Sequence, residues 1–403
     1  MAHGQRQMVP ELPRNPSNSM TKLVSALVNK IDPTADIRYQ LVWNFGGYLA
    51  DIPRRLGTNP VLDAASDALV SAHTNYCSSG HPRAGCELLA KYSHALNVLR
   101  DALDDPVKAH SSETLCAIML LMIVQVLTNP SKGFAASHGE GATQILKSRG
   151  SSGPCDEFEK KLLLTLRGPV VFEALLNDNI RFSQREWKHL VESGLKSDNI
   201  EADWFRYLAR LPDLMHRCRR ALYHPHMILD TSLSDLVFET ESLLEDCKLN
   251  ITALRDRLRT FEEDPPPSAF KTLLHAHRVR ILALALFTGI LFSCVLSSLS
   301  GKPLRLCTET SQWSHEIYHL ARVAVKYRPL GSMAMIVCLY VAWIGAASED
   351  LREKIKTLLA DYEKTCLGQI SGTELTMNLV QTEKRFTMQE PWLAQGALHV
   401  FGA

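Results

Sequence analysis

Apolar residues recur every three or four positions in segment after segment from Thr21 onward, and no segment shows a sustained alternation with a period of two. The three-to-four spacing places apolar side chains on one face of an α-helix, whereas a half-buried strand needs a period of two. The sequence therefore predicts an all-α fold, a large helical domain of stacked antiparallel helices with a central apolar helix near 281–300. The predicted helices span 21–31, 36–50, 60–76, 84–103, 112–128, 137–149, 156–178, 184–194, 201–221, 232–261, 268–300, 311–327, 331–346, 349–366 and 373–385.

Local capping signals agree with the ends of several of these helices. An N-cap side chain accepts a hydrogen bond from an amide of the first turn, and a glycine ends a helix because it adopts left-handed backbone angles easily. Such signals are Asn59-Pro60, Ser183-x-x-Glu186 and Ser371-x-x-Glu374 at helix starts, and Gly150 and Gly301 at helix ends.

Prolines divide the chain into an arm and a domain. Residues 1–20 carry three prolines among polar residues and are predicted to form a disordered N-terminal arm. Residues 21–403 are predicted to form one helical domain. Within it, three consecutive prolines follow Asp264, and because proline breaks a helix interior they mark a hinge at 262–268.

Two uncharged runs, 281–300 and 329–348, are each long enough to cross the hydrocarbon core of a bilayer. Basic residues flank the first run on both sides, whereas a single membrane-spanning helix normally has its positive charge on one side. The other reading is a helix buried on every side in a large helical domain. The sequence favours the buried helix, and a membrane-associated protein stays as the alternative.

The balance of charged residues argues against a chain that binds nucleic acid by itself. The 403 residues are 46% hydrophobic and 22% charged, as expected for a globular protein. Lys and Arg number 44 against 43 Asp and Glu, so there is no basic excess to neutralise phosphates. Ten cysteines without a recognisable secretory signal predict reduced thiols in the cytosol or nucleus. Cys116, Cys294 and Cys338 lie in apolar runs and are predicted to be buried.

One group of residues has the types that bind zinc. His73, Cys77, His81 and Cys86 lie within fourteen positions of one another. Their spacing is wide, and no Cys-x-x-Cys pair occurs in the chain, so the usual chelate of a structural zinc site is missing. The alternative is a polar loop between two helices that contains histidines. These four residues are weak candidates, and we predict no metal and no cofactor.

No catalytic motif supports an enzyme. The glycine pattern of a phosphate-binding loop and the Gly-x-Ser-x-Gly elbow of hydrolases do not occur. Acidic pairs such as Asp104-Asp105 stand at predicted helix ends, where solvation accounts for them. We therefore predict no catalytic residues, and a soluble enzyme of a biosynthetic pathway is kept only as an alternative.

A segment near residue 100 carries a resemblance to a known family. It contains Tyr92, Ala95-Leu96, Asp105-Pro106, Glu113-Thr114-Leu115 and an apolar helix, followed by His138-x-x-Gly141-Ala142 and Arg149-Gly150. This order resembles the regulatory domain of fungal-specific transcription factors, the large helical domain that usually follows a binuclear zinc cluster. The resemblance covers most of the chain from about residue 40 and is most specific between 91 and 150.

The resemblance implies a structural role for the signature residues. Gly141 and Ala142 would allow a neighbouring helix to approach closely, Gly150 would end the helix, and His138 and Arg149 would bond to neighbouring helix ends. It also implies a nuclear protein that regulates transcription, and it suggests the genes of a secondary-metabolite cluster as targets. Its partners would be proteins, either a zinc-cluster factor or a second copy of the chain, with DNA contacted only indirectly.

The chain departs from that family pattern in its cysteines. A binuclear zinc cluster needs six cysteines in a basic stretch, and no cysteine precedes Cys77 in these 403 residues. The resemblance therefore implies the regulatory half of such a factor without its DNA reader. Three alternatives follow: the protein acts at promoters through a partner, it no longer acts at promoters, or the gene model is truncated.

Overall fold

The computed structural model describes residues 18–389 except for 33–35, 80–84, 129–142, 145–146, 148–155, 178, 184–185, 187–199, 225–231, 265–269, 302–303, 305–306 and 369–370. The described residues form helices and connections, and no strand occurs among them, which confirms the predicted all-α fold. The longer helices are α1 (Ser19–Ile31), α3 (Pro60–Ser79), α4 (Cys86–Leu103), α6 (Ser112–Thr128), α8 (Glu157–Leu176), α10 (Ile200–Tyr223), α11 (Leu233–Glu263), α12 (Lys271–Ser300), α13 (Thr308–Ala324), α14 (Ala334–Gly345), α15 (Glu349–Cys366) and α16 (Gly372–Phe386). The short ones are α2 (Leu41–Phe45), α5 (Pro106–Ala109) and the 3-10 turns η1 (Gly47–Arg54), η7 (Val325–Tyr327) and η8 (Leu330–Ser332).

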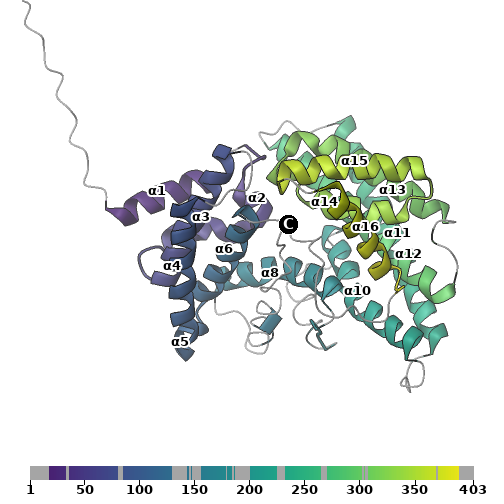
Figure 1. Ribbon diagram of the computed structural model, residues 1–403, viewed down its shortest axis with the longest axis horizontal. Helices are drawn as coiled ribbons and strands as arrows, with labels where there is room; N and C mark the ends of the chain where they lie inside the picture. Colours follow the sequence, from purple (N-terminus) through teal and green to yellow (C-terminus); the bar gives the residue numbers. More distant parts are fainter. Residues whose placement is uncertain are drawn as a thin grey trace, which may run out of the picture.

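The helices form two groups connected by α8. Helices α1 to α6 make the first group and α10 to α16 the second, and α8 runs between them along one edge of the molecule (Figure 1). Helix α8 contacts η1 and α6 on one side and α10 on the other. The groups also touch directly, since the Leu330 amide donates to the carbonyl oxygen of Arg38 at 3.0 Å.

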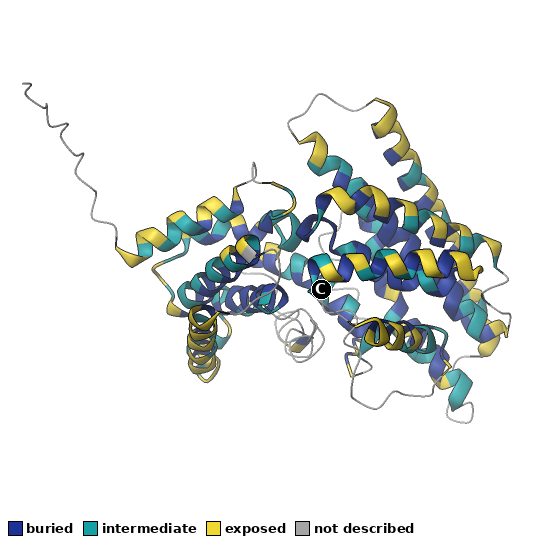
Figure 2. Ribbon diagram, turned by 45° about the horizontal axis from the view of Figure 1, so that its top comes forward, coloured by how far each residue is buried: buried dark blue, intermediate teal, exposed yellow. Residues whose placement is uncertain are grey.

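Helix α12 is the central helix of the second group, as predicted. It contacts α10, α11, α13, α14 and α16, and its side chains from Ile281 to Val295 are buried. By length and composition it is the one helix in the described chain that could cross a membrane, and 89% of its most apolar stretch is buried inside the protein. Figure 2 shows the same contrast of buried inner and exposed outer helix surfaces across the molecule.

The proline-rich stretch lies between two helices that pack against each other. Beside it, Arg278 of α12 donates to the carbonyl oxygen of Arg257 at 2.7 Å, and its guanidinium carbon lies 4.6 Å from the ring centre of Phe261. The ring of His275 lies 3.1 Å from the Glu262 carboxylate. Helices α11 and α12 thus form an antiparallel pair up to their ends, while residues 265–269 lie outside the described residues.

The single helix predicted for 36–50 is wrong. The chain forms α2, turns at Gly46 and continues as η1. Gly46 has a φ of +114°, which side chains rarely adopt, and a Cβ atom there would lie 2.7 Å from the Thr165 side chain. Apolar residues recur every three to four positions in an α-helix and every three in a 3-10 helix. The periodicity therefore did not reveal the turn at Gly46 between them.

Several predicted boundaries are accurate. Asn59 accepts from the Val61 amide at 2.9 Å, and Gly301 ends α12 with a φ of +67°. Ser183 and Glu186 exchange the two bonds of a capping box, but the rest of the helix predicted for 184–194 lies outside the described residues. Helix α1 begins at Ser19, two residues inside the predicted arm, because Asn18 caps it. Cys116, Cys294 and Cys338 are buried as predicted.

Candidate functional site

Three of the four weak zinc candidates, His73, Cys77 and Cys86, lie in α3 and α4. His73 is buried, and its Nε2 atom lies 2.7 Å from the carbonyl oxygen of Tyr39. Because a carbonyl only accepts, Nε2 carries the ring proton and does not face a metal. Burial lowers the pKa of His73 to about 4, which keeps the ring neutral.

The other three candidates do not form a metal site with His73. The Sγ atom of Cys77 lies 3.6 Å from the His73 ring, and Cys86 is exposed at the first residue of α4. His81 lies outside the described residues. Among the described residues, no three His, Cys, Asp or Glu side chains form a group that could hold a metal ion.

The signature residues His138, Gly141, Ala142, Arg149 and Gly150 lie outside the described residues, so their structural role stays a prediction.

The first half of the signature is described, and its residues cap and pack helices. Thr114 is fully buried, and its hydroxyl donates to the carbonyl oxygen of Lys108 at 2.8 Å. Asp105 accepts from the first amides of α5. Glu113 pairs with Arg55 at 2.8 Å. These contacts join α5, α6 and η1, so this part of the signature holds the first group of helices together.

The prediction that no catalytic motif occurs, which includes the absence of a second histidine after His315-Glu316, is wrong for one segment. The segment 315–319 reads His-Glu-Ile-Tyr-His, the spacing of zinc-dependent peptidases, in which the glutamate is the general base. Here Glu316 accepts two hydrogen bonds from Arg255 of α11, at 2.9 and 2.7 Å. His315 and His319 lie on the exposed face of α13 with ring centres 4.5 Å apart. Arg255 thus engages both carboxylate oxygens of Glu316, so the arrangement does not match a peptidase centre, where this carboxylate is the general base.

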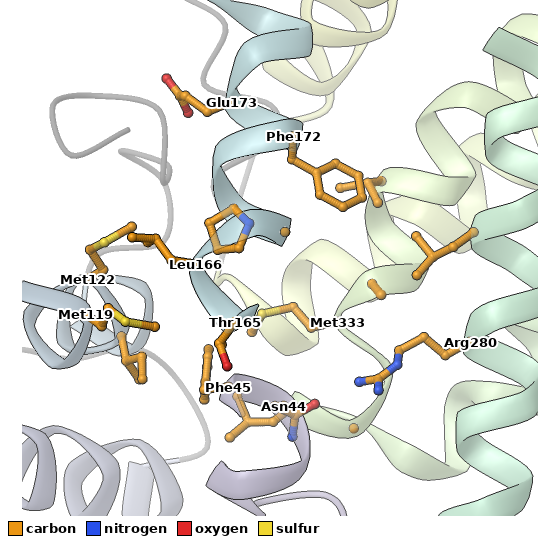
Figure 3. Close-up of a pocket in the computed structure, with 18 of the residues that line it drawn as sticks. Asn44, Phe45, Met119, Met122, Thr165, Leu166, Phe172, Glu173, Arg280 and Met333 are labelled. Carbon is orange, nitrogen blue, oxygen red and sulfur yellow. The ribbon is translucent and has the colours of Figure 1, made fainter. Parts of the chain in front are cut away.

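A cavity of about 280 Å³ lies where the two helix groups meet. Its walls come from α2, η1, α6 and α8 on one side and from α12, η8 and α14 on the other. Figure 3 shows Met119 and Met122 of α6, Phe45 of α2 and Phe172 of α8 around it. Most of the wall is apolar, which is usual for sites that bind small molecules.

Charged groups lie at two sides of the cavity. The Arg280 guanidinium is stacked over the Trp43 ring, 4.4 Å from its centre, and Nη1 lies 3.4 Å from the Trp43 carbonyl oxygen. Figure 3 shows this guanidinium directed toward Asn44. Glu173 is buried on the opposite side, and its carboxylate points away from Phe172. The cavity therefore combines an apolar interior with a guanidinium on one side and a carboxylate on the other.

One face of helix α8 lines this cavity with partly buried residues. Thr165, Gly168, Phe172 and Leu176 follow helical spacing, line the cavity and are each only partly covered. A Cβ atom added at Gly168 would meet no heavy atom within 4 Å. The walls of the cavity come from residues far apart in the chain, so no local sequence pattern predicts it. The Gly168-Pro169 pair inside the helix predicted for 156–178 was a local signal of an interrupted surface.

Comparison with known proteins identifies the family. The model of the fungal specific transcription factor domain matches residues 57–380, from the connection before α3 into α16. No curated protein and no solved structure matches the chain. The match covers α3 to α6 of the first helix group, α8, and the second group as far as residue 380 in α16, whereas α1, α2 and η1 precede it. The protein belongs to the family of the fungal specific transcription factor domain.

Proposed function

We propose that this chain is a nuclear regulator of transcription that acts through protein–protein contacts and does not read DNA itself. The family match over residues 57–380 carries this proposal, because it spans the helical domain from α3 into α16. The partner would be a DNA-bound zinc-cluster factor or a second copy of the chain. The genes would be those of a secondary-metabolite cluster, and the domain would need no catalytic residues.

The balance of basic and acidic residues supports regulation without direct binding of the chain to DNA. With 44 basic and 43 acidic residues, the chain has no general excess of positive charge. Many arginines are also engaged with acidic groups, such as Arg217 with Glu239 at 2.7 Å and Arg328 with Asp361 at 2.7 Å. Arginines paired in this way neutralise few phosphates, so affinity for duplex DNA should be low at physiological salt.

Chromatin immunoprecipitation of the tagged full-length chain in its own host tests the proposal. We expect enrichment at a discrete set of promoters that is lost when the partner factor is deleted. Enrichment that persists without any partner would assign DNA binding to this polypeptide itself. Absence of enrichment at every promoter would contradict a role in transcription.

Binding to random duplex DNA gives a second measurement that needs no partner. We expect little binding of the purified chain at physiological salt. Strong binding there, with a steep decrease as salt is raised, would overturn the indirect mechanism because it reports many phosphate contacts.

The alternative is a membrane-associated or enzymatic role in a biosynthetic pathway. The observation against its membrane form is that α12 is covered by five other helices, so its apolar surface already has partners. Extraction of host cells separates the two proposals. A chain that enters the high-speed supernatant without detergent fits the buried helix, whereas one that needs detergent fits a membrane-spanning helix.

A further inference from the structure

We propose that His315 and His319, on the exposed face of α13, chelate one divalent transition metal ion of the kind that prefers imidazole ligands, such as Zn²⁺ or Ni²⁺. The spacing of the two histidines suggests such a site, and the side chains around them determine that it binds an ion without hydrolysing a peptide. The site stands independently of the proposed role in transcription.

The two rings are placed so that one ion can reach both. Residues four positions apart on a helix lie on the same face, one turn apart. The ring centres of His315 and His319 are 4.5 Å apart, and the ring planes are inclined at 66° to each other. Zinc–nitrogen bonds are about 2.0–2.1 Å long, so two nitrogens on one ion are roughly 3 Å apart. Small rotations of the two side chains bring their nitrogens to this separation, so the helix backbone does not have to move.

Both rings are accessible to a metal ion. His315 and His319 are exposed, whereas His73, the zinc candidate of α3, is buried against a carbonyl oxygen. Partial desolvation lowers the pKa of His319, and the charges of His315 and Arg322 act in the same direction. The ring of His319 is therefore neutral at neutral pH, which is the form that binds metal ions.

The surrounding side chains limit the protein to these two ligands. The histidines lie in a groove between α13 and the start of α15, where Asp350 pairs with Lys354 at 2.5 Å. Glu316 is engaged by Arg255 through both carboxylate oxygens. In the part of the chain that the structure describes, no third His, Cys, Asp or Glu side chain completes a metal-binding group. Water therefore fills the remaining coordination positions of the ion.

A neighbouring positive charge sets the strength of binding. Arg322 follows His319 by three positions, and its guanidinium carbon lies 5.9 Å from the centre of the Tyr318 ring. Its charge helps to keep the imidazole neutral but also repels a bound cation. With two protein ligands and this repulsion, we expect a dissociation constant in the micromolar range, far weaker than that of a structural zinc site with four ligands.

Calorimetric titration of the full chain with nickel chloride at neutral pH tests the proposal. Nickel is the probe because thiolates, which also occur in this chain, select zinc more strongly. We expect one nickel ion per chain. His315→Ala and His319→Ala should each weaken binding by about tenfold or more, because a chelate loses its advantage when either ligand is removed. Both variants should fold, since alanine is the best helix former at exposed positions.

Two further variants separate the chelate from other histidines and from the effect of charge. His94→Ala is the matched control, because His94 is exposed on α4 and has no second histidine one turn away. Its affinity for nickel should equal that of the unmodified chain. Arg322→Ala should strengthen nickel binding, since it removes the repelling charge and leaves both rings in place. A purely structural role of the α13 surface predicts no such gain.

The results separate the outcomes. Weaker binding in both His315→Ala and His319→Ala, with unchanged binding in His94→Ala, supports the chelate. A loss in only one of the two variants would show a contact by a single histidine and overturn the proposal. It would also be overturned if nickel did not bind the unmodified chain, or bound it no better than the double variant. Promoter occupancy is measured separately, so failure of the metal site and failure of the proposed function are distinguishable.

Discussion

Helices α11 and α12 have nearly the same length, 31 and 30 residues, and lie side by side, yet they differ in how much of their surface is exposed to solvent. In α11 the buried residues follow one face, from Leu236 through Leu244 and Ile251 to Leu258, and the other face is charged and exposed. In α12 the buried residues surround the axis from Ile281 to Val295. The distribution of apolar residues around the helix, rather than helix length, decides which of the two occupies the centre.

This comparison also separates a buried helix from a membrane-spanning one. The uncharged run of α12 is long enough for either, but α11 presents a complementary apolar face to it. The thiol of Cys247 on that face lies 3.9 Å from the carbonyl oxygen of Ala285, which shows how closely the helices approach. An apolar run therefore has to be judged together with the amphipathic helices that cover it.

The largest effect is expected from Phe287→Ala in α12. Phe287 is fully buried and its ring centre lies 5.8 Å from that of Phe172 in α8. Removing the ring leaves a cavity that the surrounding helices cannot fill, so we expect a loss of about 3–5 kcal/mol in the free energy of unfolding. Urea unfolding followed by circular dichroism measures it.

The matched control is Phe238→Ala in α11, where the side chain is 74% exposed. Its free energy of unfolding should change by less than about 0.5 kcal/mol. Similar losses in the two variants would show that both faces of α11 are covered, and the comparison of the two helices would be wrong.

The next effect is expected from Gly289→Leu, also in α12. A Cβ atom at this position would lie 2.9 Å from the Trp313 ring and 3.2 Å from Ile251 of α11. Added side-chain atoms in such a close contact force neighbours to move, which costs about 1–3 kcal/mol. Thermal unfolding of the variant is the measurement. Ser242→Leu adds the same side chain to an exposed position of α11 and should leave the stability unchanged, so an equal decrease in both would refute the packing argument.

A smaller effect is expected at the helix start of α11. The Ser232 hydroxyl accepts from the Asp235 amide, and the Asp235 carboxylate accepts from the Ser232 amide, each at 3.1 Å. Ser232→Ala removes one of these bonds and should cost about 1 kcal/mol.

The corresponding position of α12 is Phe270, whose side chain makes no capping bond. Phe270→Ala should therefore change the free energy of unfolding by less than about 0.5 kcal/mol. A cost equal to that of Ser232→Ala would show that the two helix starts are stabilised alike. Chemical unfolding of both variants under one set of conditions makes the comparison.

Periodicity located α11 and α12 to within three residues at each end, because each pattern is long and regular. The turn at Gly46 was not predictable in this way, since it depends on the Thr165 side chain more than a hundred residues later. The capping signals at the described helix ends were also local. The capping side chain and the amide that it accepts from lie within a few positions of each other.

The candidate site could not be predicted from the sequence. Phe45, Phe172 and Arg280 meet only because α2, α8 and α12 pack around one space, and no local pattern encodes that meeting. The motif at 315–319 shows the opposite case, because a pattern with a known chemical meaning lies on an exposed helix face with its glutamate bound to Arg255. Spacing within one helix is therefore weaker evidence for a site than the side chains that surround it.

The smallest effect is expected from Thr288→Val in α12. The Trp204 indole N–H of α10 lies 2.8 Å from the Leu284 carbonyl oxygen and 3.0 Å from the Thr288 hydroxyl, so it has two acceptors. Valine removes one of them but leaves the carbonyl, and no buried donor loses its last partner. We expect a cost of about 0.5 kcal/mol, measured by urea unfolding, whereas a buried group left unsatisfied costs about 1–3 kcal/mol. A loss above that lower bound would show that the Leu284 carbonyl does not hold the indole. The central helix tolerates its few polar side chains because the backbone one turn earlier provides their partners, and this is why α12 remains buried all round despite its serine and threonine residues.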